Sequence, residues 1–426
     1  MEVYNPEREK FLELFKKGDS IFLTGRAGTG KSTLIRDLII NSDKKLIVVA
    51  PTGVAAINLR AKTIHSFFLF PLRPILPDDK EAIKKLPGKK RRILSEADTI
   101  IIDEVSMVRA DILDAVDQSI RLNLNSQEPF GGKQIIFVGD LFQLKPVITN
   151  RFNEKVILAE HYPLPAYFFD SRAFNELDPR IIELKHVYRQ DSDKLFLEIL
   201  DKVRMGRQTR SDIQALNNRY SPDYAGDQIA IELCTTNKIV NEINETKLAK
   251  LPTSSITFRA EIEDNFDKNL YPTHDVLTLK KGAQVMFIKN GEEYVNGTLG
   301  KIIELASESI EVELDTGEVI TVEKATWDNI EYSYDSEKKR IESNTIGTFT
   351  QYPLKLAWAV TIHKSQGLTF NNMFLNLGFG AFDSGQTYVA LSRCKTLEGI
   401  ILRKPIKYSD IKIDDRVVDF WFNKIE

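Results

Sequence analysis

The sequence has few of the residues that cross-link small domains or bind zinc. It contains two cysteines, Cys234 and Cys394, which lie far apart and outside any CxxC pattern, and five histidines. A disulfide framework and a cysteine-rich zinc site therefore both lack ligands. We expect a protein of a reducing compartment, the cytoplasm, associated with the nucleoid if the source is bacterial, with the nucleus and the mitochondrion left open.

Long apolar runs and an excess of one charge are missing as well. The N-terminus is charged where a signal peptide needs an apolar core, and the best apolar run, residues 46–59, contains Pro51 and Gly53, so we expect no membrane-spanning segment. The 58 lysines and arginines against 61 aspartates and glutamates give a net charge of −3. Any nucleic-acid partner therefore requires basic residues that are gathered into a groove.

The 426 residues suffice for about two to four domains, and apolar runs alternate with helical patterns along them. The spacing predicts one short helix and then four buried strands, at 6–17, 20–23, 46–50, 99–102 and 134–138. A second stretch of the same kind follows residue 192, with a strand at 229–234 and a helix at 237–250. This alternation predicts an α/β fold whose parallel sheets are covered by helices on both faces.

Two segments interrupt the alternation. Prolines punctuate residues 67–96, and the segment ends in a basic cluster that either contacts DNA or is a solvated face: Lys84, Lys85, Lys89, Lys90, Arg91 and Arg92. From about 277 to 346 the apolar period changes to two, which predicts a barrel-like all-β insertion. The predicted limits are 1–65 and 97–185 for the first domain, 66–96 for its small insertion, 186–270 and 346–426 for the second domain, and 271–345 for the β-rich insertion.

A phosphate-binding loop is the strongest single motif. Residues 25–32 fit the pattern G-x-x-x-x-G-K-S/T directly after a strand and at the start of a helix. Glycines let backbone N–H groups surround phosphate oxygens, Lys31 reaches the outer phosphates, and the Ser32 hydroxyl can bind Mg²⁺. The nucleotide-binding residues predicted here are Gly28, Thr29, Gly30, Lys31, Ser32 and Thr33.

A carboxylate pair follows the apolar run at residues 100–102. Asp103, at the end of this predicted strand, can hold Mg²⁺ together with Ser32, and Glu104 is placed to polarise a water that attacks the γ-phosphate. A strand that ends in Asp-Glu is also a common surface edge, but the phosphate-binding loop favours the functional interpretation. The pair predicts hydrolysis of a nucleoside triphosphate.

Six segments of the chain carry a resemblance to a known family: residues 24–33, 103–107, 129–134, 138–147, 361–367 and 388–393. Four of them, 24–33, 103–107, 138–147 and 361–367, resemble successive motifs of the Pif-one family of superfamily 1B DNA helicases. Residues 388–393 are similar to the last helicase motif, and residues 129–134 resemble the stretch that separates this family from its RecD-like relatives. The resemblance covers nearly the whole chain. It implies two RecA-like motor domains, the cofactors ATP and Mg²⁺, and movement in the 5′-to-3′ direction.

The resemblance also assigns roles around the nucleotide. Gln143 would sense the γ-phosphate, Arg189 and Arg393 would stabilise its charge from the second domain, and Gln366 and Gly367 would contact the nucleotide. The alternative for each arginine is a surface salt bridge. Together with the residues of the phosphate-binding loop and the carboxylate pair, the predicted catalytic set is Lys31, Asp103, Glu104, Gln143, Arg189 and Arg393.

For DNA, the resemblance implies contacts in both domains. They are Thr52, Gly53, Val54, His65, Ser66, Phe67 and Lys145 in the first, and Thr236, Asn237, Thr361, His363 and Lys364 in the second. His65 and Phe67 offer flat faces for base stacking, although Phe67 and Phe68 could instead pack in the core. Two positions depart from the family: Arg8 stands where Gln is usual, and Lys145 where Pro is usual.

We therefore expect an ATP-dependent DNA helicase that moves along single-stranded DNA and unwinds duplex or structured DNA. Expected partners are single strands and single-strand/duplex junctions, with G-quadruplexes and RNA–DNA hybrids as further candidates. The resemblance implies roles in DNA repair, recombination and telomere maintenance, and we expect a monomer in the absence of DNA. The alternatives are a DNA-stimulated ATPase that remodels DNA without unwinding it, and a P-loop phosphotransferase that acts on a small molecule.

Overall fold

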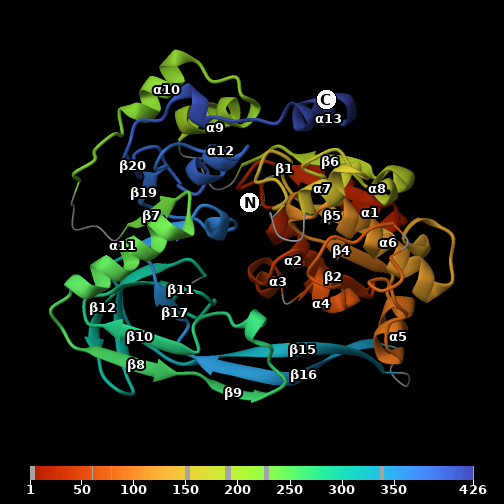
Figure 1. Ribbon diagram of the computed structural model, residues 1–426, viewed down its shortest axis with the longest axis horizontal. Coiled ribbons are helices and arrows are strands. Elements are labelled where there is room, and N and C mark those ends of the chain that lie inside the picture. Colours follow the sequence, from red (N-terminus) through yellow and green to blue (C-terminus); the bar gives the residue numbers. More distant parts are fainter. Residues whose placement is uncertain are drawn as a thin grey trace. The chain divides into compact units, whose positions relative to one another are not determined.

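A computed structural model describes residues 5–59, 61–77, 79–148, 154–187, 193–224, 230–294, 296–335 and 340–425. The chain forms two compact units (Figure 1). Unit 1 consists of Met1–Arg189, Ile330–Asn344 and Asp415–Glu426, and unit 2 of Gln190–Asn329 and Thr345–Asp414. Over the described ranges, no helix combines the length and the apolar character that crossing a membrane requires.

Unit 1 is built on a parallel sheet with the strand order β3-β2-β4-β5-β1-β6. Its strands are β1 (Ile21–Gly25), β2 (Leu46–Ala50), β3 (Lys62–Thr63), β4 (Thr99–Ile102), β5 (Gln134–Val138) and β6 (Arg180–Leu184). The central strands β1, β4 and β5 are buried along their whole length because helices cover both faces. The four strands predicted in this half of the chain are confirmed.

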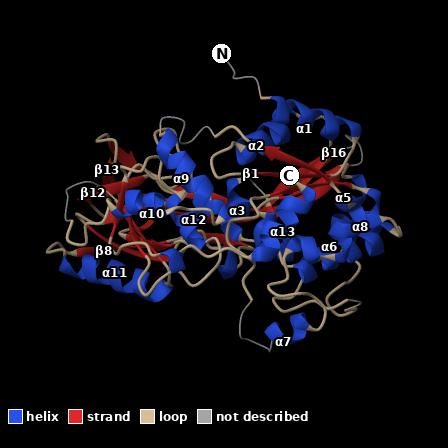
Figure 2. Cartoon of the chain, turned by 90° about the horizontal axis from the view of Figure 1, so that it is seen from above, coloured by secondary structure: helices blue, strands red, loops and turns tan. Residues whose placement is uncertain are grey.

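Helices lie against both faces of this sheet (Figure 2). On one face, α1 (Pro6–Lys17) and α2 (Lys31–Asn41) form a common core with Ile21 and Leu23 of β1. Phe22 alternates to the other face and packs edge-on against Phe168 and Phe174. The remaining helices of the unit are α3 (Gly53–Asn58), α4 (Ile64–Phe68), α5 (Gly88–Glu96), α6 (Ala110–Leu124), α7 (Glu154–Ala159), α8 (Arg172–Leu177) and α13 (Asp415–Lys424).

The helix predicted at 6–17 is α1, and its ends show why the sequence encodes it. The Asn5 side chain accepts a hydrogen bond from the backbone N–H of Arg8, which caps the N-terminus. Gly18 ends the helix with a φ of 91°, a left-handed conformation that glycine adopts without strain. Both signals are local, so the sequence alone places this helix correctly.

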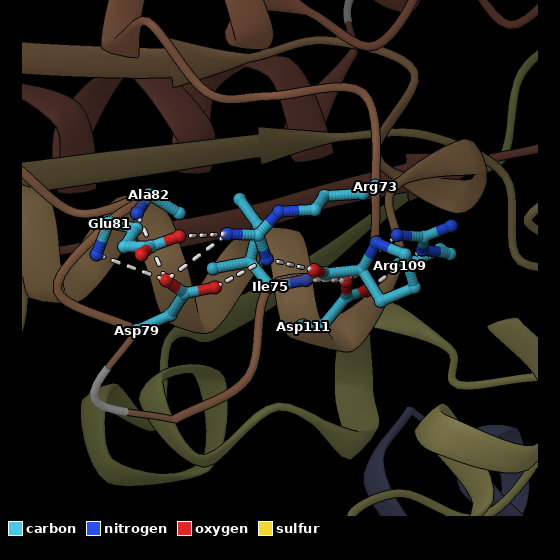
Figure 3. A network of polar contacts seen from close by, with 8 residues as sticks. Arg73, Ile75, Asp79, Glu81, Ala82, Arg109 and Asp111 are labelled. Atoms are coloured by element: carbon cyan, nitrogen blue, oxygen red, sulfur yellow. Dashed lines mark hydrogen bonds and ion pairs between the residues drawn. The ribbon is translucent and has the colours of Figure 1, made fainter. Parts of the chain in front are cut away.

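The small insertion between α4 and α5 contains no further helix or strand in its described part, and α6 anchors it (Figure 3). The buried Asp111 carboxylate accepts the backbone N–H of Ile75 at 3.0 Å, and Asn123 accepts that of Leu86 at 2.8 Å. From the predicted basic cluster, Lys90 turns inward and donates to the carbonyls of Ser66 and Phe67 at 2.7 and 3.1 Å. Lys90 is therefore part of the structural anchoring.

Unit 2 contains a second parallel sheet with the order β18-β7-β19-β20. The strands are β7 (Ile231–Cys234), β18 (Ala359–Thr361), β19 (Met373–Asn376) and β20 (Ile400–Leu402), and the helices are α9 (Lys194–Met205), α10 (Arg210–Asn217), α11 (Asn237–Lys250) and α12 (Gln386–Leu391). The prediction of two α/β domains with parallel sheets is confirmed.

The rest of unit 2 is antiparallel β structure (Figure 1). A five-stranded sheet has the order β14 (Val319–Val322), β13 (Ile310–Leu314), β12 (Leu299–Leu305), β11 (Gln284–Phe287) and β17 (Leu354–Leu356). The strands β8 (Ser255–Arg259) and β10 (Val276–Lys280) pair with each other, and β15 (Ala325–Asp335), β16 (Arg340–Gln351) and β9 (Glu261–Asp264) form a third sheet. The parts of β15 and β16 that fall within Ile330–Asn344 are assigned to unit 1. Phe258 of β8 and Leu279 of β10 share one core with the five-stranded sheet.

The predicted limits of this β-rich insertion, 271–345, are too narrow. Strands β8 and β9 come before residue 271, and β17 comes after residue 345. The apolar run at 354–360 divides between two sheets, because β17 pairs with β11 and β18 pairs with β7. β18 is buried along its whole length, whereas only Leu354 of β17 is fully buried, and periodicity does not show which sheet a short apolar strand joins.

The predicted range of the second domain, 346–426, is also too long at its C-terminal end. The last helix, α13, belongs to unit 1. Its Phe420 ring stacks on Phe169 with the centroids 4.5 Å apart, and Arg416 forms an ion pair with Asp170. Trp421 of the same helix is buried and packs edge-on against Phe142. These contacts are remote in sequence, so nothing in the local pattern predicts them.

Candidate functional site

The phosphate-binding loop connects β1 to α2 and depends on glycine at its first position. Gly25 has a φ of 146°, and a Cβ there would lie 2.6 Å from the carbonyl oxygen of Leu184 and 2.9 Å from Oγ1 of Thr29. Gly28 and Gly30 have φ values of 83° and 85°, in the left-handed region that glycine favours. The loop therefore has the close backbone packing that a phosphate cradle requires.

The side chains of the loop face its own carbonyl groups. Nζ of Lys31 donates to the carbonyl oxygens of Gly25 at 2.7 Å and Arg26 at 3.0 Å, and Oγ1 of Thr29 also donates to Arg26. Ser32 and Thr33 are exposed in the first turn of α2. The Lys31 ammonium thus lies over the loop, where it can exchange carbonyl oxygens for phosphate oxygens without a large movement.

The carboxylate pair lies after β4, which adjoins β5 in the same parallel sheet as β1. Asp103 is buried, with an exposed fraction of 7%, and its backbone N–H donates to the carbonyl of Val49. Burial, reinforced by the neighbouring Glu104 charge and opposed by Lys31, raises the pKa of Asp103 to about 7. Glu104 has a φ of 49°, an unusual value for a residue other than glycine.

Two buried hydroxyl groups at the carboxyl edge of this sheet fit a polar ligand. Oγ1 of Thr24, at the end of β1, and Oγ of Ser106, just after Asp103, have no hydrogen-bond partner among the described residues. Buried polar atoms that lack partners are costly and usually serve a bound group. The set of Ser32, Asp103 and these hydroxyls therefore suits a hydrated Mg²⁺ bound to a nucleotide, since this cation prefers oxygen ligands and keeps several waters.

Gln143 follows β5, so it shares the carboxyl edge of the sheet with Lys31 and Asp103. Its backbone N–H donates to the carbonyl of Asp140, whose side chain in turn accepts the N–H of Phe142 at 3.2 Å. This tight turn buries Gln143, which is 9% exposed. The four residues of unit 1 that were predicted to be catalytic therefore follow strands at one edge of the same sheet, whereas Lys145 lies two residues beyond Gln143 and is half-buried.

Of the two candidate arginines, Arg189 lies outside the described residues. Arg393 is buried with an exposed fraction of 2%, and its guanidinium donates to the carbonyls of Val389 and Leu368 and to Oγ of Ser392. The alternative of a surface salt bridge is therefore wrong for Arg393. Gln366 is buried, and Gly367 is exposed with a φ of 80°.

The candidate DNA residues of unit 1 differ in how accessible they are to a ligand. A Cβ on Gly53 would meet nothing within 4 Å, and Oγ1 of Thr52 accepts the N–H of Ala55 at 3.3 Å. The Val54 side chain lies outside the described residues. Phe67 is 1% exposed and packs edge-on against Phe68. The structure contradicts the prediction that Phe67 offers a face to a base, because core packing covers its ring.

His65 and Ser66 occupy α4, the same short helix that carries Phe67. His65 is partly buried, and burial together with the positive charge of Arg109 lowers the pKa of its imidazole, while Asp111 opposes the shift. A neutral ring results, which favours stacking or hydrogen bonding over attraction to a phosphate. The Ser66 carbonyl is held by Lys90, so the basic insertion supports this candidate segment.

In unit 2, the candidate DNA residues meet at one edge because β7 and β18 are adjacent and parallel. Thr236 caps α11, where its Oγ1 accepts the N–H of Ile239 at 3.4 Å, and Asn237 beside it is exposed. Oγ1 of Thr361 accepts the N–H of the exposed Lys364 at 3.3 Å.

His363, between Thr361 and Lys364, is partly buried in the same unit. Burial lowers the pKa of its imidazole, and the nearby Asp383 opposes that shift. The ring is therefore biased toward its neutral form, as at His65.

Sequence reasoning left several contacts out. Thr24 and Ser106 stand inside recognised motifs but carried no assigned role, and nothing at the C-terminus suggested that Trp421 would pack on Phe142 beside Gln143. Arg8, which departs from the family pattern, pairs with Asp37 of α2 at 3.2 Å. Arg8 is thereby tied to the helix that begins at the phosphate-binding loop.

Comparison with known proteins identifies relatives for the whole chain. A family model described as PIF1-like helicase matches residues 6–213, and one described as DNA helicase Pif1, 2B domain, matches residues 261–305. The chain is 31% identical to the ATP-dependent DNA helicase Pif1 of Bdellovibrio bacteriovorus, over 98% of this chain and 91% of that protein. It is 32% identical to the human ATP-dependent DNA helicase PIF1, over 97% of this chain but 63% of the human protein.

Solved structures give the same result. The crystal structure of Bacteroides sp Pif1 in complex with ADP-AlF4 has a TM-score of 0.91 and 37% identity, over 99% of this chain and 97% of that chain. Bacteroides Pif1 bound to ssDNA has a TM-score of 0.73 at 37% identity, with the same coverage of both chains. Pif1 helicase from Candida albicans has a TM-score of 0.76 and 29% identity, over 99% of this chain and 100% of that chain.

Proposed function

Because this chain belongs to the PIF1-like helicase family and is an ATP-dependent DNA helicase, we propose that it uses ATP hydrolysis to move along single-stranded DNA in the 5′-to-3′ direction. The observation that carries the catalytic part of the proposal is the carboxyl edge of the unit 1 sheet. There the loop after β1, the Asp103–Glu104 pair after β4 and Gln143 after β5 follow neighbouring parallel strands. Ligands of open α/β sheets bind at this edge.

Each predicted catalytic residue of unit 1 has a separate role in hydrolysis. The loop amides and Lys31 bind the β- and γ-phosphates, and Ser32 and Asp103 would hold Mg²⁺. When bound, the metal ion supplies charge that offsets the negative charge of the transferring phosphoryl group. Glu104 accepts a proton from the attacking water, and Gln143 orients that water or the γ-phosphate through its amide.

Two arginines, Arg189 at the limit of unit 1 and Arg393 of unit 2, complete the proposed site. Arg393, with Arg189, contributes positive charge at the γ-phosphate during hydrolysis. Among the contacts of Arg393 are three hydrogen bonds to neutral carbonyl and hydroxyl oxygens. An anionic phosphate accepts stronger hydrogen bonds than these neutral groups, so exchange toward the nucleotide is favourable.

The nucleic acid is proposed to contact each unit at its own candidate segments. In unit 1 these are Thr52, Gly53, Val54, His65, Ser66 and Lys145, and in unit 2 they are Thr236, Asn237, Thr361, His363 and Lys364. Exposed basic residues of the insertion, among them Lys84, Lys85 and Arg91, are proposed to face the duplex at a junction. G-quadruplexes and RNA–DNA hybrids are further proposed substrates.

A strand-displacement assay tests the proposal. Duplexes with a 5′ tail, a 3′ tail or no tail are incubated with the full chain, with and without ATP. We expect ATP-dependent displacement of the 5′-tailed duplex only. Displacement of the 3′-tailed duplex would overturn the direction, and hydrolysis stimulated by DNA without displacement would support a remodelling ATPase. Hydrolysis that is indifferent to DNA would support a small-molecule phosphotransferase.

A further inference from the structure

The loop between β19 and α12 carries an aromatic side chain that nothing covers. Phe379 is exposed to 109%, at least as much as in an isolated residue, and it lies between Gly378 and Gly380, which have φ values of 61° and 122°. Exposure of one large apolar side chain is common on protein surfaces. The location of this one, rather than its exposure alone, suggests a function.

The loop lies beside the candidate DNA segments of unit 2. A Cβ on Gly378 would be 3.6 Å from Oγ1 of Thr235 and 3.2 Å from Cδ1 of Ile239, which flank Thr236 and Asn237. At the other end of the loop, Asp383 is close enough to His363 to oppose the burial that lowers the pKa of that imidazole. Phe379 therefore follows β19 at the same sheet edge as the segments after β7 and β18.

A lysine accompanies the ring. Nζ of Lys404 donates to the carbonyl of Gly378 at 2.7 Å and lies 5.5 Å from the centroid of the Phe379 ring. The hydrogen bond holds the backbone at the base of the ring, and the cation interacts with the ring through its π electrons. Aromatic rings next to cations, along a groove that follows the backbone, are how proteins bind single strands without sequence preference.

We propose that Phe379 stacks on a base of the single strand bound by unit 2 and that Lys404 positions the ring for this contact. The inference deepens the proposed function and rests on it. Stacking needs an open aromatic face and tolerates every base, since every base has a π surface. Phe379 thereby takes the stacking role that the sequence suggested for Phe67, whose ring the core covers.

Equilibrium binding of a fluorescein-labelled oligothymidylate to the full chain tests the inference. We expect Phe379→Ala to bind about tenfold more weakly than the natural chain, while Phe379→Trp binds normally. The slope of log K against log salt should stay unchanged in Phe379→Ala, because no phosphate contact is lost. Tyr220→Ala is the matched control, since Tyr220 is an exposed aromatic residue beside the outer strand β20.

The Phe379→Trp variant gives a second, independent measurement. The three natural tryptophans, Trp327, Trp358 and Trp421, are buried with exposed fractions of 5%, 8% and 6%. The added indole is therefore the solvent-accessible one, and we expect the oligonucleotide to quench its emission. Unchanged affinity in Phe379→Ala together with unquenched Trp emission, while the natural chain binds, would overturn the stacking role alone. Failure of the natural chain to bind would instead overturn the proposed function.

Discussion

The Phe142 ring meets the indole of Trp421 edge-on, with the ring centroids 5.3 Å apart. Phe142 directly precedes Gln143, and Trp421 belongs to α13, the helix with which the chain returns to unit 1 after unit 2 ends at Asp414. The backbone turn that holds Gln143 thus rests on a residue almost 300 positions away. We infer that α13 supports the γ-phosphate end of the nucleotide site.

Truncation of this contact should impair hydrolysis more than nucleotide binding. Trp421→Ala leaves a cavity beside Phe142, with a loss of about 3–5 kcal/mol in the free energy of unfolding for a buried aromatic side chain. We expect a lower kcat with nearly unchanged nucleotide affinity, measured by steady-state ATPase assays and a fluorescent ATP analogue, because the phosphate-binding loop is not touched.

Two further variants distinguish the effect of losing this packing contact from the effect of a general loss of structure. Trp421→Phe keeps an aromatic edge against Phe142 and should retain most activity. Phe422→Ala, at a neighbouring position of α13 that is 39% exposed, should leave both parameters near their natural values. A folded Trp421→Ala protein that hydrolyses ATP at the natural rate would refute the supporting role of α13.

The sequence predicts those features that depend on contiguous residues. The strands β1, β2, β4 and β5 are short apolar runs, α1 has both of its caps, and the phosphate-binding loop is a local pattern, so each was recognisable without a structure. The return of α13 to unit 1 and the burial of Phe67 depend on packing between remote segments. Such contacts leave no periodic signal in the sequence, and the same holds for Phe379, whose location matters only once β7 and β19 are paired.

Glu104→Gln should separate nucleotide binding from turnover. The amide keeps the size of the side chain but cannot accept the proton of the attacking water. We expect kcat for ATP to fall by about 10²–10⁴-fold, the usual contribution of a general base, while equilibrium binding of a fluorescent nucleotide stays the same. Glu160→Gln, an exposed carboxylate elsewhere in unit 1, is the matched control. Natural turnover in Glu104→Gln would remove this residue from the catalytic set.

Asp111→Ala should release the small insertion from α6. The buried Asp111 carboxylate binds the backbone N–H of Ile75 and receives two hydrogen bonds from Arg109, both 2.8 Å long (Figure 3). Its loss leaves Arg109 with Glu154 as its remaining carboxylate partner in the described network, at 3.6 Å. Breaking a buried ion pair by removing one partner costs about 3–5 kcal/mol.

Amide hydrogen exchange measures this release directly. We expect faster exchange at Ile75 and its neighbours in Asp111→Ala, with the sheet of unit 1 unaffected. Asp79→Ala, which removes the more exposed ion pair with Arg73 in the same network, should change exchange much less. Equal protection of Ile75 in Asp111→Ala and in the natural chain would show that other contacts hold the insertion.

Lys364→Ala should reduce the salt dependence of single-strand binding. Lys364 is exposed at the candidate DNA edge of unit 2, where Thr361 orients its backbone. If this ammonium neutralises one phosphate, its loss lowers the slope of log K against log salt by about 0.7. Titrations of an oligothymidylate between low and moderate salt measure the slope, and Lys301→Ala, an exposed lysine of β12, is the control. An unchanged slope in Lys364→Ala would mean that this residue does not contact a phosphate.

Lys355→Met should stabilise the protein at neutral pH and lose this advantage in alkali. Lys355 lies on β17 between Leu354 and Leu356, which pack in the β-rich core, and in the described part of the chain no carboxylate forms an ion pair with it. Burial, reinforced by the Lys364 charge, lowers the pKa of its ammonium to about 8. Between about pH 8 and the ordinary value near 10.5, the unfolded chain binds a proton that the folded chain does not, so the stability of the natural protein rises with pH.

Thermal unfolding at pH 7 and pH 10 should therefore show a higher Tm for Lys355→Met at pH 7 and a smaller difference at pH 10, with Lys301→Met as the exposed control. If the difference in Tm between Lys355→Met and the natural chain is the same at both pH values, the charge of Lys355 does not destabilise the folded protein.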